Sequence, residues 1–226
     1  MKKINNLKKA KNPFVFYARL SLTLATGKAV SSTRNLLEIL RTCPDSVIYA
    51  HSHRFLQTHQ FAGTSPANDF SLWASHALGD EELAEKLGVI EPLSYSSLEQ
   101  IRKDLVSILS RHLESHTDNR TAPPGQELHL LSSVRFSVST GLKAWDLEEF
   151  QKALKKSSPA TIYLHAFESR LRSAQGVSDF SKWLEEEIDE ANLAQEIAEL
   201  DPHAQTLSKI KEDILKMTQQ RLEAKK

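Results

Sequence analysis

Apolar and polar residues alternate with a period of two near the start of the chain. The apolar positions are Phe14, Phe16, Ala18, Leu20, Leu22 and Leu24, and the polar positions between them include Arg19, Ser21 and Thr23. This period is typical of a β-strand with one buried face. The run ends at Thr26-Gly27, and glycine readily adopts the positive φ that a turn requires. We therefore expect either one long strand or a short hairpin that folds back at Gly27.

The residues that follow have the 3.6-residue period of amphipathic helices. In one of these helices Ile48, His51 and Phe55 share a face at spacings of i, i+3 and i+7. Short polar residues precede several of the apolar runs, as expected for side chains that cap the first turn of a helix. We expect about five helices, which begin near Ser32, Asp45, Asn68, Glu81 and Ser97.

This order of elements returns in the second half of the chain. Residues 26–51 match residues 140–165 without a gap, and Asp-Phe-Ser-x-Trp occurs at 69–73 and again at 179–183. Self-similarity of this kind indicates an internal duplication. We expect a mostly α (α+β) fold in which each duplicated unit has one extended segment or short hairpin followed by about five helices. The two units are expected to pack with pseudo-twofold symmetry.

The repeats also set the expected domain boundaries. Residues 1–12 are rich in lysine and asparagine and have little to bury, so we expect a disordered basic tail. The first repeat would span residues 13–116 and the second residues 128–226. Residues 117–127 contain Pro-Pro-Gly and form the expected linker.

Composition narrows the class of protein. The 226 residues carry 29 basic and 29 acidic side chains, so no overall field would attract nucleic acid or an anionic membrane. No stretch approaches the roughly 20 consecutive apolar residues of a membrane span. A single cysteine, Cys43, excludes an intramolecular disulfide framework. We expect a cytoplasmic protein that binds neither nucleic acid nor membrane.

The order Phe-x-Phe, Thr-Gly, Ile-Tyr-x-His, Asp-Phe-x-x-Trp, Leu-Ala, acidic-Pro resembles that of a prokaryotic family known only as a domain of unknown function. The unit of that family is likewise found in tandem. The resemblance covers about residues 14–115 and 128–222. The resemblance implies a mostly helical cytoplasmic protein, but it does not indicate an enzymatic reaction.

The repeated histidines, His51 and His165, are the first candidates for a functional site. A histidine in both copies could bind a metal or act as a general base. It could equally be a packing residue, hydrogen-bonded to a backbone group or carboxylate, and we favour this interpretation. Asp69 and Asp179 could join the histidines in a site for zinc, iron or manganese. A carboxylate at a helix start is also stabilised by the helix dipole, so we expect no metal there.

Other candidate ligand-binding residues are aromatic or basic. Tyr49 and Tyr163 could donate a hydrogen bond to a ligand, and Arg54 and Arg170 could bind an anion. Tyrosines at these intervals are more often part of a core, and arginines at helix ends are usually solvated. The repeated tryptophans are expected to be core anchors as well.

The sequence lacks the compact signatures of many enzymes. It has no Gly-rich phosphate loop, no Gly-x-Ser-x-Gly elbow and no zinc-finger spacing. It has no His-Glu-x-x-His, and we expect no His-x-x-x-His pair clearly exposed on one helix. We therefore expect no cofactor and favour a protein that is not an enzyme.

These observations predict a non-catalytic tandem-repeat protein that binds or regulates a partner, which would be a protein or a small molecule. A homodimer is compatible with the sequence. The alternative is a small-ligand or carbohydrate-related binding protein or enzyme, with its site at the repeat junction near His51 and His165. The alternative gains if the two histidines share one accessible cavity, and the first hypothesis gains if each is enclosed separately.

Overall fold

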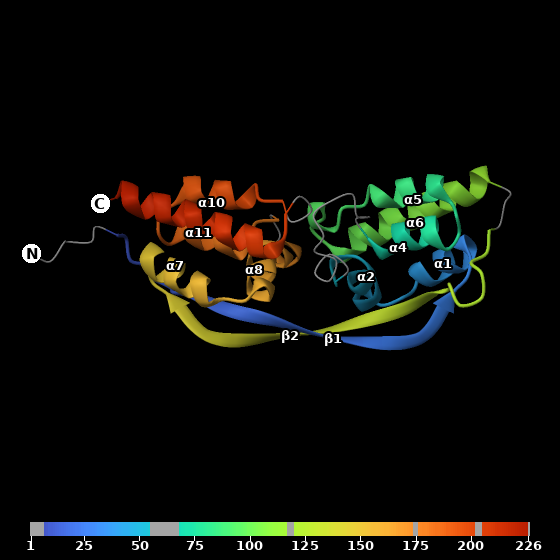
Figure 1. The fold of residues 1–226 in the computed structure, drawn as a ribbon, viewed down its shortest axis with the longest axis horizontal. Coiled ribbons are helices and arrows are strands. Elements are labelled where there is room, and N and C mark those ends of the chain that lie inside the picture. Colours follow the sequence, from blue (N-terminus) through green and yellow to red (C-terminus); the bar gives the residue numbers. More distant parts are fainter. Residues whose placement is uncertain (1–6, 55–67, 117–119, 174–175, 202–204, 226) are drawn as a thin grey trace, which may run out of the picture. The chain divides into compact units, whose positions relative to one another are not determined.

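The computed structural model describes residues 7–54, 68–116, 120–173, 176–201 and 205–225. It is mostly helical with one two-stranded antiparallel sheet, an α+β fold (Figure 1). This confirms the predicted fold class. Contacts divide the chain into two compact units. We call the described residues between 21 and 135 unit A, and the described residues between 7 and 20 and between 136 and 225 unit B.

The sheet consists of β1 (Phe14–Val30) and β2 (Leu128–Ala144). Each strand is continuous through its Thr-Gly pair, so the hairpin considered for Gly27 is not formed. Gly27 has φ 74° inside β1. A glycine with a positive φ bends the strand that contains it, as in a β-bulge. The Thr26 hydroxyl stabilises the bend, because it accepts a hydrogen bond from the Lys28 amide and donates one to the Leu130 carbonyl.

Each strand contributes to both units. β1 begins in unit B and ends in unit A, whereas β2 begins in unit A and ends in unit B. Unit A therefore combines the helices of the first half of the sequence with the start of the strand from the second half. Unit B has the reverse composition.

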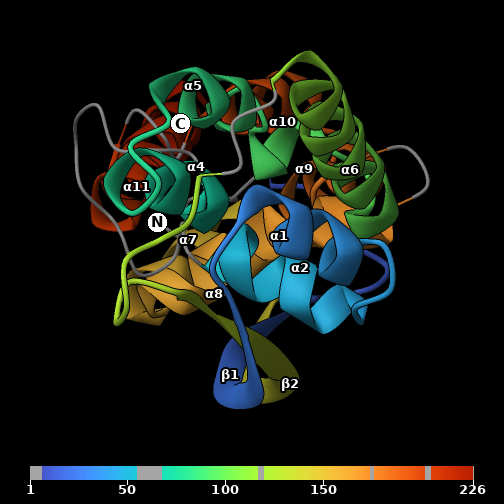
Figure 2. The same cartoon turned by 90° about the vertical axis from the view of Figure 1, so that its right-hand side faces the viewer.

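The helices of unit A begin where side chains cap them. Ser32, Asn68 and Ser97 each accept a hydrogen bond from an amide in the first turn of the following helix. The elements are α1 (Thr33–Leu40), α2 (Asp45–His51), α4 (Asp69–His76), α5 (Glu81–Gly88), the 3-10 helix η1 (Pro92–Ser94) and α6 (Leu98–Ser115). Figure 2 shows α1 and α2 next to the ribbon of β1 and β2.

The helices of unit B follow in the same order. They are α7 (Leu147–Lys156), α8 (Pro159–Ala166), the 3-10 helix η2 (Glu168–Arg172), α9 (Asp179–Glu186), α10 (Ala191–Ala198) and α11 (Leu207–Ala224). Asp146 caps α7, as its capping-box sequence indicates. The two Ile-Tyr sequences occupy equivalent elements, since Ile48 lies in α2 and Ile162 in α8. In the described residues, no helix is long and apolar enough to cross a membrane.

The N-terminal segment differs from the predicted disordered tail. Residues 1–6 lie outside the described residues, but residues 8–12 are held against unit B. The Ala10 amide donates to the Trp145 carbonyl, and the amides of Lys11 and Asn12 donate to the Glu187 carboxylate. These contacts are long-range in sequence, so composition alone does not indicate them.

Part of the expected linker is also ordered. Thr121 forms an isolated antiparallel bridge with Ser32, and the Ala122 amide donates to the Ser31 carbonyl. Ala122 is buried. This segment therefore packs as an extended addition to unit A, and residues 117–119 lie outside the described residues.

Trp73 and Trp183 are buried in their respective units, as predicted. The indole N–H of Trp73 donates to the Gln126 carbonyl at 3.1 Å, and that of Trp183 donates to the Asn12 carbonyl at 2.9 Å. Each tryptophan thus fixes the segment that leads into a strand. In unit B the indole also stacks on Phe150, with ring centroids 5.6 Å apart.

Truncation of either buried tryptophan should destabilise its unit. We expect Trp183→Ala and Trp73→Ala each to cost about 3–5 kcal/mol, because a large aromatic side chain and the partner of a buried carbonyl are both lost. Urea denaturation followed by circular dichroism measures the effect. Trp145, which is 42% exposed, provides the matched control, and Trp145→Ala should change stability much less. Equal losses at all three positions would contradict the role assigned to the two buried indoles.

Candidate functional site

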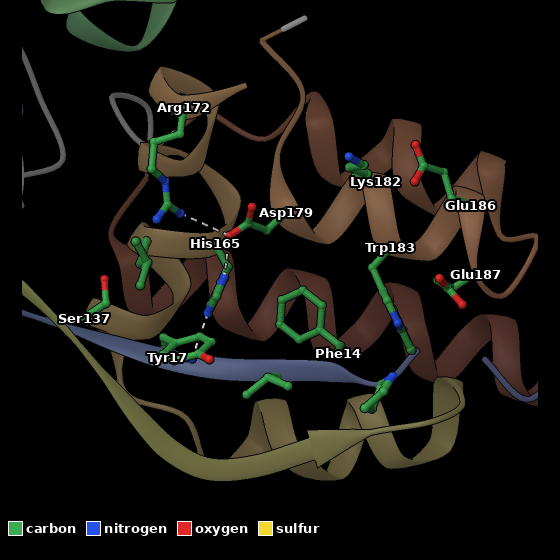
Figure 3. Close-up of a pocket in the computed structure, with 13 residues that line it drawn as sticks. Phe14, Tyr17, Ser137, His165, Arg172, Asp179, Lys182, Trp183, Glu186 and Glu187 are labelled. Atoms are coloured by element: carbon green, nitrogen blue, oxygen red, sulfur yellow. Dashed lines mark hydrogen bonds and ion pairs between the residues drawn. The ribbon is translucent and has the colours of Figure 1, made fainter. Parts of the chain in front are cut away.

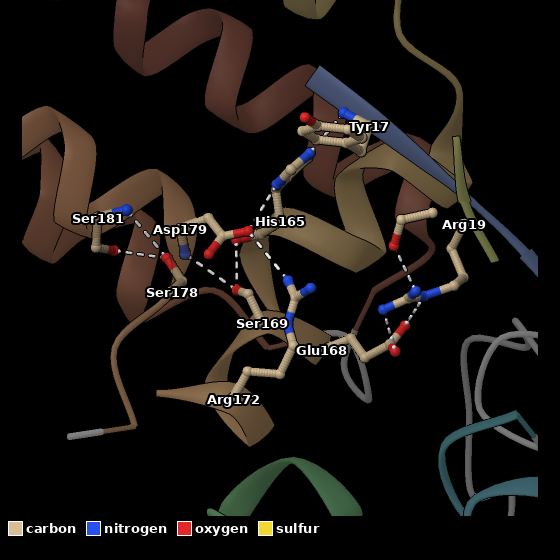
Figure 4. A network of polar contacts seen from close by, with 10 residues as sticks. Tyr17, Arg19, His165, Glu168, Ser169, Arg172, Ser178, Asp179 and Ser181 are labelled. Atoms are coloured by element: carbon tan, nitrogen blue, oxygen red, sulfur yellow. Dashed lines mark hydrogen bonds and ion pairs between the residues drawn. The ribbon is translucent and has the colours of Figure 1, made fainter. Parts of the chain in front are cut away.

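His165 joins three elements of unit B (Figure 4). Its Nδ1 lies 2.8 Å from Oδ2 of Asp179 on α9, and its Nε2 accepts a hydrogen bond from the Tyr17 amide of β1 at 2.9 Å. A backbone N–H can only donate, so Nε2 carries no hydrogen and Nδ1 donates to the carboxylate. The geometry therefore fixes one neutral tautomer of a buried imidazole.

His51 has the same partners in unit A. Its Nδ1 lies 2.5 Å from Oδ2 of Asp69, and its Nε2 accepts from the Leu131 amide of β2 at 2.9 Å. In both units, a helix from one half of the sequence thereby holds a strand from the other half. Both ring nitrogens of each histidine are engaged in hydrogen bonds.

This arrangement bears on the four residues considered for a metal site. His51 and Asp69 belong to unit A, whereas His165 and Asp179 belong to unit B. Within each unit the imidazole lone pair at Nε2 points to a backbone amide, so it is not available to a metal ion or a substrate proton. The geometry favours a structural role for each pair, which was the interpretation preferred from sequence.

The other candidates are largely buried. The guanidinium carbon of Arg135 lies over the Tyr49 ring, 4.1 Å from the ring centroid. Tyr163 packs against Phe167, and both tyrosines are buried. Arg170 donates to the Ala198 carbonyl at 2.9 Å, and burial lowers the pKa of its guanidinium.

Arg54, the last described residue before 55–67, is partly buried. The structure thus places the two tyrosines in the cores of their units, and it gives Arg170 a backbone partner in place of an exposed anion site.

A groove of about 590 Å³ opens beside His165 in unit B (Figure 3). Its wall combines the rings of Phe14, Tyr17 and Trp183 with charged side chains on α9. Arg172 and Asp179 face each other at one end, with Nη2 and Oδ2 3.3 Å apart. The groove could hold a small polar ligand, but its histidine has no free nitrogen for acid–base chemistry.

The Glu187 carboxylate, which also lines the groove, has partners in the N-terminal segment. The side-chain amide of Asn12 donates to Glu187 and lowers the pKa of this carboxyl group, with help from the backbone amides of Asn12 and Lys11. Glu187 therefore binds the N-terminal segment.

Arg19 and Glu168 form a second bridge between β1 and the helices of unit B (Figure 4). Nε and Nη2 of Arg19 lie 3.1 Å and 2.8 Å from the two carboxylate oxygens of Glu168, and both side chains are buried. Such a bidentate pair is directional and costly to break on one side only. Arg19 also donates to the Ser137 hydroxyl of β2, so these two side chains share the helix-facing side of the ribbon.

The opposite side of the ribbon is apolar. In unit B, Leu20, Phe136 and Val138 alternate with Arg19 and Ser137, so they point away from the helices. Leu20 is 57% exposed and Phe136 is 51% exposed.

Unit A shows the same pattern. Ser133 is buried and Arg135 covers Tyr49, while Val134 lies exposed between them, and Leu22 and Leu24 are exposed on β1. The sequence predicted that one face of residues 14–24 is buried throughout. This is wrong beyond Phe16, because the helix-facing side changes along the strand, from Phe14 and Phe16 to Arg19. The apolar period of residues 14–24 was visible, but not the change of side.

Sequence reasoning also missed a polar cluster in unit A, formed by Asp80, Glu82, His112 and His116. The signal was present: His112, in the last turn of α6, and His116, which directly follows the helix, form a His-x-x-x-His pair. Their cluster is considered below.

The described residues define an α+β protein in which paired long strands are each anchored to two helical units. The chain belongs to the DUF5752 family, a family of unknown function, whose model matches residues 11–219. This agrees with the resemblance to a domain of unknown function noted from sequence. The structure of OrfY from Thermoproteus tenax is similar, with a TM-score of 0.80 and 28% identity over 95% of this chain and 98% of that chain. No curated protein matches significantly.

Loss of the imidazole acceptor should loosen β1. We expect His165→Phe to retain the aromatic packing with Phe14 and Phe180 but to leave the Tyr17 amide without a partner. A buried unsatisfied donor costs about 1–3 kcal/mol. Amide hydrogen exchange at Tyr17, together with urea denaturation, measures both effects.

His129 is exposed on β2 and serves as the control. His129→Ala should leave stability within about 0.5 kcal/mol of the wild-type value. Unchanged protection of the Tyr17 amide in His165→Phe would show that the imidazole does not hold the strand.

Proposed function

We propose that this protein is a non-catalytic, internally duplicated binding protein, and that the outer face of its β-ribbon is the docking surface. The exposed apolar side chains on that face carry the proposal. Each unit presents three of them, which are Leu20, Phe136 and Val138 in unit B and Leu22, Leu24 and Val134 in unit A. In each unit, exposed apolar side chains on one face of the strands are typical of a site of protein association.

The ribbon is also incomplete as a sheet. Each strand has one hydrogen-bonded neighbour, so the described sheet has two strands only. Isolated two-stranded ribbons are marginal in water and gain stability from a further layer. The helices supply such a layer on the side of Arg19 and Ser133, whereas the side of Leu20 and Val134 has no cover from the described residues.

A second copy of this chain is the partner that fits the surface best. We call the six exposed apolar residues of this face the apolar stripe. They are Leu, Val and Phe, so the apolar stripes of two copies can meet without opposed like charges. The chain has a formal net charge of zero, and no long-range repulsion opposes self-association. In a twofold dimer the same patch meets itself, and sheets packed face to face lie about 10 Å apart.

A small-ligand function is the second candidate, and the groove beside His165 favours it. Aromatic side chains next to Arg172, Asp179 and Lys182 would suit a polar ligand such as a sugar or an amino acid. The engaged nitrogens of His165 argue for binding without catalysis. This hypothesis predicts a monomer whose apolar stripe is neutral to function.

Sedimentation velocity over a range of protein concentrations tests the docking surface. We expect the wild-type chain to form a dimer and the double substitution Leu22→Ser with Phe136→Ser to shift it to the monomer. Both side chains are exposed, so the free energy of unfolding of the monomer should change by only about 0.5 kcal/mol per site.

Val89 is 78% exposed, lies at the end of α5 and is not part of the ribbon, so Val89→Ser is the matched control. It should leave the dimer intact. A wild-type chain that stays monomeric at the highest concentration, or a dimer that persists in the double variant, would overturn the proposal.

A further inference from the structure

The C-terminal end of α6 and the start of α5 form a compact polar cluster in unit A. His112 lies in the last turn of α6, and His116 is the residue that directly follows the helix. Their rings stack with centroids 4.3 Å apart. One ligand atom from each of Glu82, His112 and His116 lies within 4.8 Å of the others. A cavity of about 260 Å³ opens at this cluster.

Each histidine presents Nε2 to a carboxylate. Nε2 of His112 lies 3.0 Å from Oδ2 of Asp80, and Nε2 of His116 lies 3.2 Å from Oε2 of Glu82. The other oxygen of Asp80 accepts from the Leu83 amide as the cap of α5. Two ligands about 2.0–2.2 Å from a tetrahedral metal ion are separated by a little over 3 Å, which is close to these distances.

The contacts of His116 are compatible with a cation at this cluster. Its Nδ1 lies 2.9 Å from the Ser115 hydroxyl and 3.1 Å from the carbonyl oxygen of His112. When Nδ1 donates to this carbonyl, the lone pair of the neutral imidazole is at Nε2 and faces the Glu82 carboxylate. A metal ion between these two acceptors would offset their repulsion.

Unit B provides an internal comparison. Its equivalent of Asp80 is Glu190, since these residues precede α5 and α10 respectively. The Glu190 carboxylate is buried and bound by two permanent cations, with Nε of Arg221 at 2.6 Å and Nζ of Lys225 on its other oxygen.

Arg221 in the last turn of α11 is equivalent to His112 in the last turn of α6, and Lys225 and His116 are the residues that directly follow these helices. Unit A therefore has imidazoles where unit B has fixed positive charges, and it adds a second carboxylate, Glu82. A bound divalent ion would restore the positive charge that the two histidines do not carry when neutral.

We propose that Glu82, His112 and His116 bind a zinc ion, with Asp80 as a further oxygen donor at the edge of the site. Two imidazoles and carboxylates are a ligand set that zinc accepts, whereas magnesium and calcium prefer oxygen ligands alone. The site is independent of the proposed docking surface.

Two other cations near the cluster occupy different positions. Lys86 bonds Oε1 of Glu82 at 2.5 Å, which leaves Oε2 for the ion. This bond lowers the pKa of Glu82. Arg120 lines the cavity and donates to the Gly79 carbonyl. Both would remain beside a bound zinc ion.

Isothermal titration of the full, chelator-treated chain with zinc chloride tests the proposal. We expect saturable binding of one zinc ion per chain, a higher thermal midpoint in zinc, and no comparable response to magnesium. Glu82→Gln and His116→Gln should each weaken zinc binding by more than about tenfold.

The most specific test is a double variant of unit A that carries the residues found at the equivalent positions of unit B. His112→Arg with His116→Lys should retain the fold, because Arg221 and Lys225 occupy these positions in unit B, and it should abolish saturable zinc binding. If it does not fold, His116→Gln alone serves, since this side chain is partly exposed. His129→Ala is the control and should bind as the wild type does. Absence of saturable zinc binding in the wild type, or equal affinity in the His116 variants, would overturn the proposal.

Discussion

The hydrogen bond from a strand amide to a buried imidazole is the contact on which each unit depends. In unit B it joins Tyr17 to His165, and in unit A it joins Leu131 to His51. A strand held in this way has a fixed position along its axis, because one amide alone can face the imidazole. The aspartate that accepts from the opposite nitrogen orients the ring. One histidine side chain therefore fixes the position of the strand relative to its own helix and to the carboxylate. The aromatic core of unit B and the Arg19–Glu168 pair then pack around a strand already placed.

Much of the local structure could be predicted from sequence because it depends on neighbours along the chain. Caps such as Asn68 and Asp146 mark where helices begin, and the heptad-like spacing of Leu98, Ile101 and Leu105 marks the long α6. The repeated Ile-Tyr-x-His sequence pointed to equivalent helices, and α2 and α8 are such a pair. These signals are short-range, so they need no knowledge of the tertiary fold.

The pairing of strands could not be predicted in the same way. A period of two indicates a strand but not its partner or the place where its buried face changes, so Leu20 seemed equivalent to Phe14. Similarly, Lys11 and Asn12 looked like a solvated tail, since Glu187 is distant in sequence. The sequence identified His51 and His165 as candidates, but their partners, and hence the tautomer that restricts their chemistry, required coordinates. The four-residue spacing of His112 and His116 is visible in the sequence. The carboxylates of Asp80 and Glu82 that face them, which suggest a metal site, are seen only in the structure.

The exchange of strand segments between the two halves of the sequence also constrains the order of folding. The helices of unit A are complete in the chain by Ser115, yet their imidazole at position 51 has no strand to bind until Leu131 has been synthesised. During translation the contact between His51 and β2 can therefore form only after the start of the second half has emerged from the ribosome. Unit B closes later still, onto a strand made at the very start. Contacts between residues so distant in sequence raise the contact order, and they are expected to slow folding relative to a simple pair of helical bundles.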